Sequence, residues 1–143
     1  MSELNSNSFR IDLSVRSYEC DLQGIVNNAI YLNYLEHARH LFLQSYGVNF
    51  ADMHDEGKDL VVIRFEIDYK YPLRDSDEFY ILTSMEQESR LRFVFHQEIY
   101  KLPEQDKLVL KSKLTGTCIS AETGKPLVCN ELIELIQTKV GQC

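Results

Sequence analysis

The chain has 143 residues, with 22 acidic and 15 basic side chains, and its formal net charge at pH 7 is −7. Proteins that bind nucleic acid gain affinity from a basic face that releases counterions, so this balance disfavours a nucleic-acid partner. The length suits one domain spanning residues 1–143 and is too short for two enzymatic domains. An anionic ligand remains compatible with this charge, because a local cluster of basic side chains can bind one.

No apolar run approaches the ~20 residues that a helix needs to span a membrane, and the N-terminal residues lack the apolar core of a signal peptide. The four cysteines are widely spaced without a C-x-x-C pair, which favours reduced thiols over a disulfide framework or a zinc site. We therefore expect a cytoplasmic protein with no membrane span and no bound metal.

The first expected strand begins at Phe9, where apolar and polar side chains alternate as far as Arg16. A polar turn containing Asp21 and Gly24 follows, and it leads into a long amphipathic helix. The apolar positions of this helix recur at spacings of three and four residues: Tyr31, Tyr34, Leu35, Ala38, Leu41, Phe42 and Tyr46.

Residues that favour helix caps mark both ends of this helix. Asn27 and Asn28 precede the periodic run and Gly47 follows it, so we expect the helix to begin at about Asn28 or Ala29 and to end just before Gly47. The opposite face is polar and carries Asn33, Glu36, His37, Arg39, His40 and Gln44. Glu36 and Arg39 are interpreted as an ion pair on the helix surface, and the two histidines as solvent or interface contacts.

The remainder of the chain is predicted to be mostly strands. Residues 49–59 are polar and contain Gly57, which predicts a connector with one helical turn; His54 and Asp55 in it are interpreted as solvated. Further strands are expected at residues 61–71, 78–88, 91–102 and 107–120, with breaks at Pro72, Ser89-Arg90 and residues 103–106. A turn at residues 122–126 precedes a short C-terminal helix, which is indicated by Val128, Leu132, Leu135 and Ile136.

The strand at residues 61–71 has the clearest alternation. We expect one apolar face made of Val61, Ile63, Phe65, Ile67, Tyr69 and Tyr71. Successive strands after a single long helix, with no helices between them, predict an antiparallel sheet packed on that helix. The predicted fold class is therefore α+β.

The turn before the helix brings together groups suited to acyl transfer. A helix N-terminus leaves backbone N–H groups unpaired and carries partial positive charge, so it is a place where a carbonyl oxygen or an oxyanion can be held. Gly24 lets the turn adopt a conformation that returns the Asp21 carboxylate over the first helical turn. A carboxylate beside an oxyanion donor is a minimal acyl-transfer site. The alternative is that Asp21 only closes the turn.

Cys20 is a rival nucleophile next to Asp21. Neighbouring residues of an extended segment point to opposite faces, and no histidine precedes the helix to activate the thiol, so Asp21 is favoured. The chain also lacks the local motifs of serine hydrolases, phosphate-binding loops, dinucleotide sites and zinc proteases.

The run from Asp21 to Tyr31, DLQGIVNNAIY, followed by Tyr34, Glu36, Ala38 and Arg39, closely resembles the signature of hotdog-fold acyl-CoA thioesterases of the 4-hydroxybenzoyl-CoA thioesterase type. The resemblance implies a five-stranded antiparallel sheet wrapped around one long central helix. It also implies that Asp21 acts as nucleophile or general base and that the Asn28 N–H polarises the thioester carbonyl. Many relatives carry histidine at the Ile25 or Asn28 position, so the roles of those histidines do not transfer to this chain.

The same resemblance implies hydrolysis of acyl-CoA or acyl-carrier-protein thioesters by a homodimer or homotetramer, with active sites between subunits. Coenzyme A enters as part of the substrate, and no separate cofactor is expected. The implied contacts are Tyr31 and a neighbour's Val62, Ile63 and Arg64 for the acyl group, and Arg90 and Arg92 for the coenzyme A phosphates. The alternatives are that Tyr31, instead of placing its hydroxyl at the mouth of the acyl pocket, is a core residue on the helix face, and that the two arginines lie in a solvated turn. Two other functions stay open: a non-catalytic acyl-CoA-binding module, and a hydratase, which needs a His–Asp pair although residues 22–31 contain no histidine.

Overall fold

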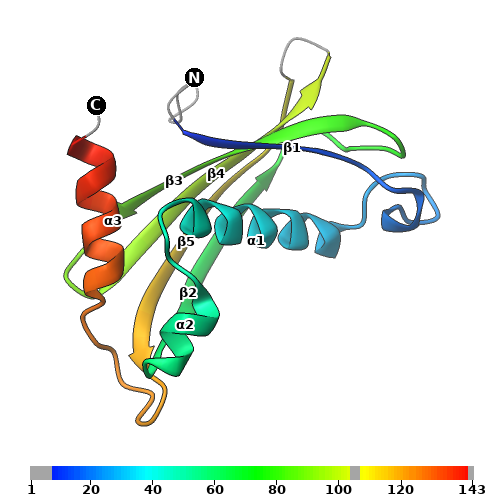
Figure 1. Cartoon of the computed structure of the whole chain (residues 1–143). Helices are drawn as coiled ribbons and strands as arrows, with labels where there is room; N and C mark the ends of the chain where they lie inside the picture. The colour runs from blue at the N-terminus through cyan, green and yellow to red at the C-terminus, as the bar shows by residue number, and fades with distance from the viewer. Residues whose placement is uncertain (1–7, 104–106, 142–143) are drawn as a thin grey trace.

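The computed structural model describes residues 8–103 and 107–141 (Figure 1). Its strands are β1 (Phe9–Ser14), β2 (Lys58–Tyr69), β3 (Glu78–Gln87), β4 (Arg92–Leu102) and β5 (Lys107–Ser120). Its helices are α1 (Asn28–Ser45), α2 (Phe50–Asp55) and α3 (Asn130–Gly141), with a short 3-10 turn, η1 (Ser17–Glu19), before α1. These bounds confirm the predicted helix, strands and one-turn connector. Most of the predicted turn at residues 103–106 lies outside the described residues.

The five strands form one antiparallel sheet in the order β1-β3-β4-β5-β2, so β1 and β2 are its edges. The sheet curves around α1, which lies across one face, and α3 stands near the end of β3 (Figure 1). This arrangement confirms the predicted α+β class, with a long helix against an antiparallel sheet.

The inner face of β2 differs from the prediction. Its register against β5 shifts between Val62 and Arg64, which places a bulge at Ile63. A bulge sets two residues opposite one, so the alternation changes face there. Phe65 packs toward the core as predicted, but Ile63 is 45% exposed, and before the bulge Leu60 packs inward. The prediction that Ile63 shares the buried face of the strand is therefore wrong.

Arg39 is the second correction, because it belongs to the buried face of α1. Its guanidinium donates from Nη1 to Gln97 Oε1 over 3.0 Å, and Gln97 Nε2 donates to the Leu35 carbonyl at 3.0 Å and to Thr83 Oγ1 at 3.1 Å. Burial lowers the pKa of Arg39 to about 10, while the nearby Glu36 charge opposes this change. Arg39 thus fastens α1 to the middle of the sheet instead of forming the predicted surface ion pair.

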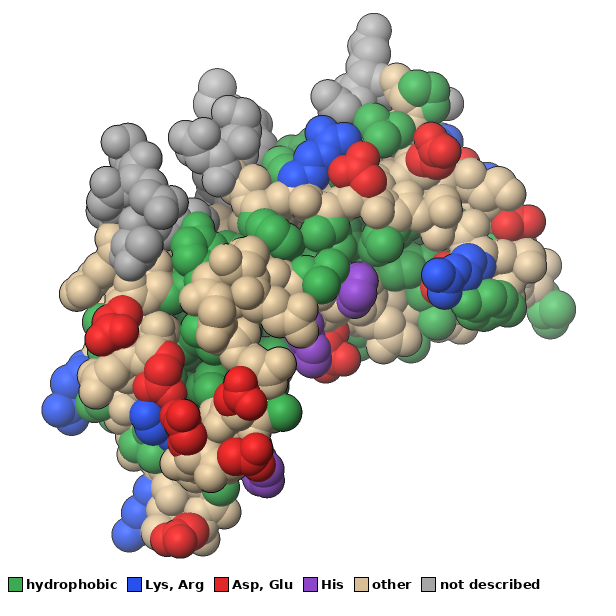
Figure 2. All heavy atoms as spheres, in the orientation of Figure 1, with side chains coloured by type: hydrophobic (Ala, Val, Ile, Leu, Met, Phe, Trp, Pro, Cys, Tyr) green, Lys and Arg blue, Asp and Glu red, His purple; other side chains and the backbone are tan. Residues whose placement is uncertain are grey.

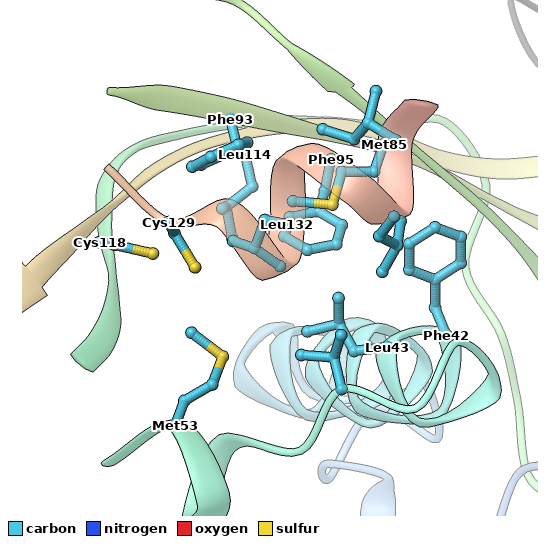
Figure 3. Packing of buried hydrophobic residues seen from close by; sticks show 13 residues of the cluster. Phe42, Leu43, Met53, Met85, Phe93, Phe95, Leu114, Cys118, Cys129 and Leu132 are labelled. Atoms are coloured by element: carbon cyan, nitrogen blue, oxygen red, sulfur yellow. The ribbon is translucent and has the colours of Figure 1, made fainter. Parts of the chain in front are cut away.

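The core divides into two clusters along α1. One lies at the C-terminal half of the helix, where Phe42 and Leu43 pack against Leu132 of α3 and the inner faces of β4 and β5 (Figure 3). Cys118 and Cys129 are fully buried free thiols at its edge, and their side chains face each other (Figure 3). Cys143 lies outside the described residues.

The surface has no broad basic patch on the face shown in Figure 2. Acidic side chains gather there over α2 and the connection to α3, which is the lower left of the view. Within the described part of the chain, no helix is long and apolar enough to cross a membrane.

Candidate active site

Asp21 lies on a narrow loop whose two sides are bonded to each other. The backbones of Cys20 and Val26 pair as an isolated bridge, and the Asp21 N–H donates to the Ile25 carbonyl over 2.9 Å. Asp21 Oδ1 accepts the Gln23 N–H at 2.8 Å and, more weakly, the Ile25 N–H at 3.4 Å. Among the described residues none donates to Oδ2, and the side chain is exposed. Asp21 therefore closes the turn and still presents one carboxylate oxygen.

Gly24 takes the conformation that this turn requires. Its φ is +80°, in the left-handed region that glycine adopts without a steric cost, and its N–H donates to the Asp21 carbonyl over 3.0 Å. A Cβ at this position would meet no atom within 4 Å. The need for glycine is therefore conformational and does not come from crowding.

The N-terminus of α1 is capped, yet it leaves one N–H unpaired. Asn27 has an extended backbone, and its side-chain oxygen accepts the Ala29 N–H at 2.9 Å, as the sequence predicted for a cap. Asn28 is the first helical residue, and no hydrogen bond of the described residues takes up its N–H. The candidate oxyanion donor thus lies at the positive end of the helix dipole.

Backbone contacts fix the Asp21 loop to the segment that follows β2. The Val26 N–H donates to the Leu73 carbonyl over 2.8 Å, and Ile25 forms an isolated bridge with Arg74. Leu73 is fully buried. These contacts place Asp21 at the end of the sheet where β1 and β2 finish (Figure 1).

The surroundings of Cys20 disfavour ionisation of its thiol. Cys20 is half-buried, and burial raises the pKa of its thiol, with further increases from the charges of Asp75, Asp21, Glu19 and Asp77. The thiolate is the nucleophilic form of cysteine, so these surroundings disfavour the form that would react.

Tyr31 is placed in the core. It is 4% exposed, and its hydroxyl accepts the Leu73 N–H at 3.0 Å. Its ring packs edge-on against Tyr34 and Tyr69, with centroids 6.1 and 5.6 Å apart. Because the hydroxyl bonds a buried backbone N–H, the structure favours the core alternative for Tyr31 over a place at the mouth of an acyl pocket.

Val62, Ile63 and Arg64 lie on the free edge of the sheet. Val62 and Ile63 are 57% and 45% exposed, and Arg64 forms an exposed ion pair with Glu66 at 3.2 Å. Tyr69 lies at the Asp21 end of β2. Val62 is seven residue steps away from it, which corresponds to roughly 23 Å along a strand. One chain therefore does not bring these three residues to its own Asp21.

A cavity of about 410 Å³ opens between α1, α2 and the strands β2, β4 and β5. Six of its lining residues are apolar: Phe50, Leu60, Val61, Val62, Phe95 and Leu114. Four are polar: Glu36, Arg39, His40 and Asp59. Of this set, only Val62 was predicted to contact an acyl group, because the walls come from distant segments that no local pattern connects.

Arg90 and Arg92 are exposed at the hairpin between β3 and β4. Ser14, near the Asp21 loop, pairs with Glu78 at the start of β3, whereas the hairpin follows the other end of that strand. Nine residue steps along β3 correspond to roughly 30 Å. These arginines therefore lie at the end of β3 opposite to the Asp21 loop, and their contact with coenzyme A stays a prediction.

The histidines lie outside the Asp21 loop. His37 and His40 are exposed on α1, where the His40 ring packs on Phe50 with centroids 4.5 Å apart. His54 is exposed, and its Nδ1 lies 2.7 Å from Asp59 Oδ1. The part of the chain that the structure describes holds no group of three side chains arranged to bind a metal ion.

The sequence profile of the thioesterase superfamily matches residues 23–107, which is more than half of the chain. The chain belongs to this superfamily. The matched region contains Gly24, Asn28 and the whole of α1, and it begins two residues after Asp21.

Individual relatives agree with this assignment. The chloroplast acyl-acyl carrier protein thioesterase ATL3 of Arabidopsis thaliana is 36% identical over 104 residues, which cover 73% of this chain and 55% of ATL3. The chain thus spans about half the length of that relative. The long-chain acyl-CoA thioesterase FadM of Escherichia coli is 32% identical over 129 residues, covering 90% of this chain and 96% of FadM.

A solved structure shows the same architecture. A hypothetical protein from Aquifex aeolicus superposes with a TM-score of 0.81 at 32% identity, covering 90% of this chain and 98% of that one. The probable thioesterase YbaW from Escherichia coli also superposes, with a TM-score of 0.75 at 29% identity over 93% of this chain and 96% of that one. These likenesses confirm the expected hotdog fold.

Proposed function

We propose that the chain hydrolyses acyl thioesters to a free acid and a thiol, with Asp21 as nucleophile or general base and the Asn28 N–H as oxyanion donor. One observation carries the proposal: a backbone-fixed, exposed carboxylate lies on the loop that leads directly to an unpaired helix N–H. The named activities of ATL3 and FadM support a thioester as the substrate class.

A thioester suits so small a site. Its carbonyl gains little resonance from sulfur, and a thiolate leaves readily, so one carboxylate and one oxyanion donor suffice where an amide would need a full triad. As general base, Asp21 takes a proton from water while the water oxygen attacks the carbonyl carbon. As nucleophile, Asp21 attacks that carbon itself and forms an anhydride, which water then cleaves. In both routes the C–S bond breaks when the oxyanion held by Asn28 collapses.

The acyl chain is best accommodated by a second copy of the protein. Tyr31 fills the space beneath the start of α1, so the chain cannot extend there. The cavity lined by Val62 offers apolar walls, and it opens beside the exposed sheet edge that carries Ile63 and Arg64. Pairing of two β2 edges would cover this surface and bring the cavity of one subunit toward the Asp21 loop of the other. The hairpin arginines Arg90 and Arg92 would likewise reach coenzyme A only across subunits.

The proposal is tested by incubating the protein with a panel of acyl-CoA and acyl-carrier-protein thioesters and measuring thiol release. We expect hydrolysis by the wild type and, in Asp21→Asn, a fall in kcat of at least about a hundredfold with the fold intact. Asp55→Asn, on exposed α2, is the matched control and should hydrolyse normally. Tight binding of acyl-CoA without turnover would instead identify a binding module, and near-wild-type hydrolysis by Asp21→Asn would remove Asp21 from the mechanism.

A further inference from the structure

Glu19 lies where the two ends of the Asp21 loop meet. Its Oε1 accepts hydrogen bonds from the Tyr34 hydroxyl at 2.7 Å and from the Arg16 N–H at 2.9 Å. Its backbone carbonyl accepts the Asn27 N–H at 3.1 Å. One residue therefore fixes both the turn that precedes Asp21 and the asparagine that caps α1.

Tyr34 is a rigid anchor for this carboxylate. It is 6% exposed, and its ring is held by Phe79 at 4.8 Å and by Tyr31 at 6.1 Å between centroids. Packing on both sides leaves the hydroxyl little freedom, so its position relative to α1 is set by the core. The bond to Glu19 transfers that fixed position to the loop.

The hydroxyl also remains a donor at neutral pH. Burial, and then the hydrogen bond to Glu19, raise the pKa of Tyr34 well above its ordinary value. A short bond from a hydroxyl to a carboxylate belongs to the stronger class of hydrogen bonds.

We propose that Glu19 and Tyr34 are positioning residues that set the Asp21 carboxylate relative to the Asn28 N–H. The inference rests on the proposed thioester hydrolysis, since that reaction requires both groups to meet one carbonyl. Glu19 precedes Asp21 by two residues, and its carbonyl holds the residue before Asn28. Without the Tyr34 hydroxyl, the Glu19 side chain loses its only link to the core in this network, and the loop can shift against the helix. A displacement of about 1 Å in a catalytic group costs on the order of a hundredfold in rate.

The first test compares two Tyr→Phe variants. Tyr34→Phe should lower kcat about tenfold or more and change KM less than about twofold. Tyr100→Phe is the matched control, because its hydroxyl also donates to a glutamate, Glu98, over 2.9 Å. Tyr100 lies on the face of the sheet away from α1, since its neighbour Ile99 packs in the core with that helix. This control should keep the wild-type kcat.

The second test separates positioning from stability. A rate loss caused by partial unfolding disappears when the assay is cooled well below the melting temperature, whereas a misplaced carboxylate gives the same ratio of kcat values at every such temperature. Glu19→Gln keeps an acceptor and should retain more activity than Glu19→Ala. The double variant Glu19→Ala, Tyr34→Phe should be no slower than Glu19→Ala alone, because each change breaks the same hydrogen bond between Tyr34 and Glu19.

The outcomes distinguish this inference from the function on which it rests. Full activity in Asp21→Asn would overturn the proposed function itself. An inactive Asp21→Asn together with a wild-type kcat in Tyr34→Phe would overturn the positioning role and leave the function standing. A loss in Tyr34→Phe that vanishes on cooling would do the same.

Discussion

The hydroxyl of Tyr31 accepts the backbone N–H of Leu73 over 3.0 Å, and this bond ties the first turn of α1 to the segment that follows β2. The Leu73 carbonyl in turn accepts the Val26 N–H at 2.8 Å. Tyr31, which the sequence left open as a pocket or core residue, is therefore a structural support of the Asp21 loop.

Removal of that hydroxyl should destabilise the protein. Tyr31→Phe leaves the buried Leu73 N–H without a partner, and such a group costs about 1–3 kcal/mol. Urea unfolding should show a loss of this size, while Tyr46→Phe, at the half-buried end of α1, should show little change. An unchanged free energy of unfolding combined with an altered acyl preference would contradict this structural role and indicate that the hydroxyl contacts the acyl group.

The exposed β2 edge should pair two copies of the chain. An unpaired edge with exposed apolar residues is a surface that proteins cover, and we expect a mass of at least twice the chain mass of 16.7 kDa by light scattering at micromolar concentration. Val62→Glu should shift the protein toward monomer, while Ser14→Glu on the opposite edge, β1, should not. A monomeric wild type would contradict the prediction of a dimer. Dissociation by Ser14→Glu alone would indicate that the subunits meet at β1 instead of β2.

The cavity beside β2 should determine the acyl-chain preference. Buried methylenes contribute about 0.8 kcal/mol each until the space is filled, so kcat/KM should rise along a straight-chain acyl-CoA series and then stop or fall. Val62→Trp fills the cavity that Val62 lines and should move the optimum to shorter chains. Ile63→Trp, on the outer edge beside the bulge, tests whether the chain passes along that edge as well. If neither variant moves the optimum, the acyl chain does not run beside β2.

The ion pair between His54 of α2 and Asp59 of β2 should stabilise the protein to an extent that depends on pH. Its hydrogen bond to Asp59 raises the pKa of His54 above its usual 6.5. A group whose pKa rises on folding stabilises the fold fully below its unfolded pKa, and this contribution is lost as pH rises through the folded pKa. The melting temperature of His54→Gln should therefore fall below that of the wild type by more at about pH 6 than at about pH 8.5. Asp59→Asn should show the same pH dependence, and an equal deficit at both pH values would exclude the ion pair as its source.

Local signals explain why much of this molecule could be predicted from sequence. The bounds of α1 follow from the Asn27 cap, the apolar period and Gly47, all of which lie within one segment. The positions of Asp21 on the turn and of Asn28 at the helix start were predictable for the same reason, since a single continuous run holds both.

The incorrect predictions involve partners that lie far away along the chain. Arg39 was assigned to the polar face because its acceptor, Gln97, is 58 residues away on β4. The bulge at Ile63 arises from the pairing of β2 with β5, and the alternation of apolar and polar residues within β2 does not reveal it. The cavity beside β2 could not be predicted for the same reason, because it is enclosed by five elements and appears only when they pack together.

The surroundings of Cys20 bear on the proposed thioester hydrolysis. An ionised thiol beside the reacting carbonyl could take the acyl group by exchange of one thioester for another, and the chain would then acylate itself instead of releasing an acid. Burial and the neighbouring carboxylates raise the pKa of the Cys20 thiol, which disfavours its ionised form. If the proposed function holds, the acidic loop would therefore protect the protein from its own substrate.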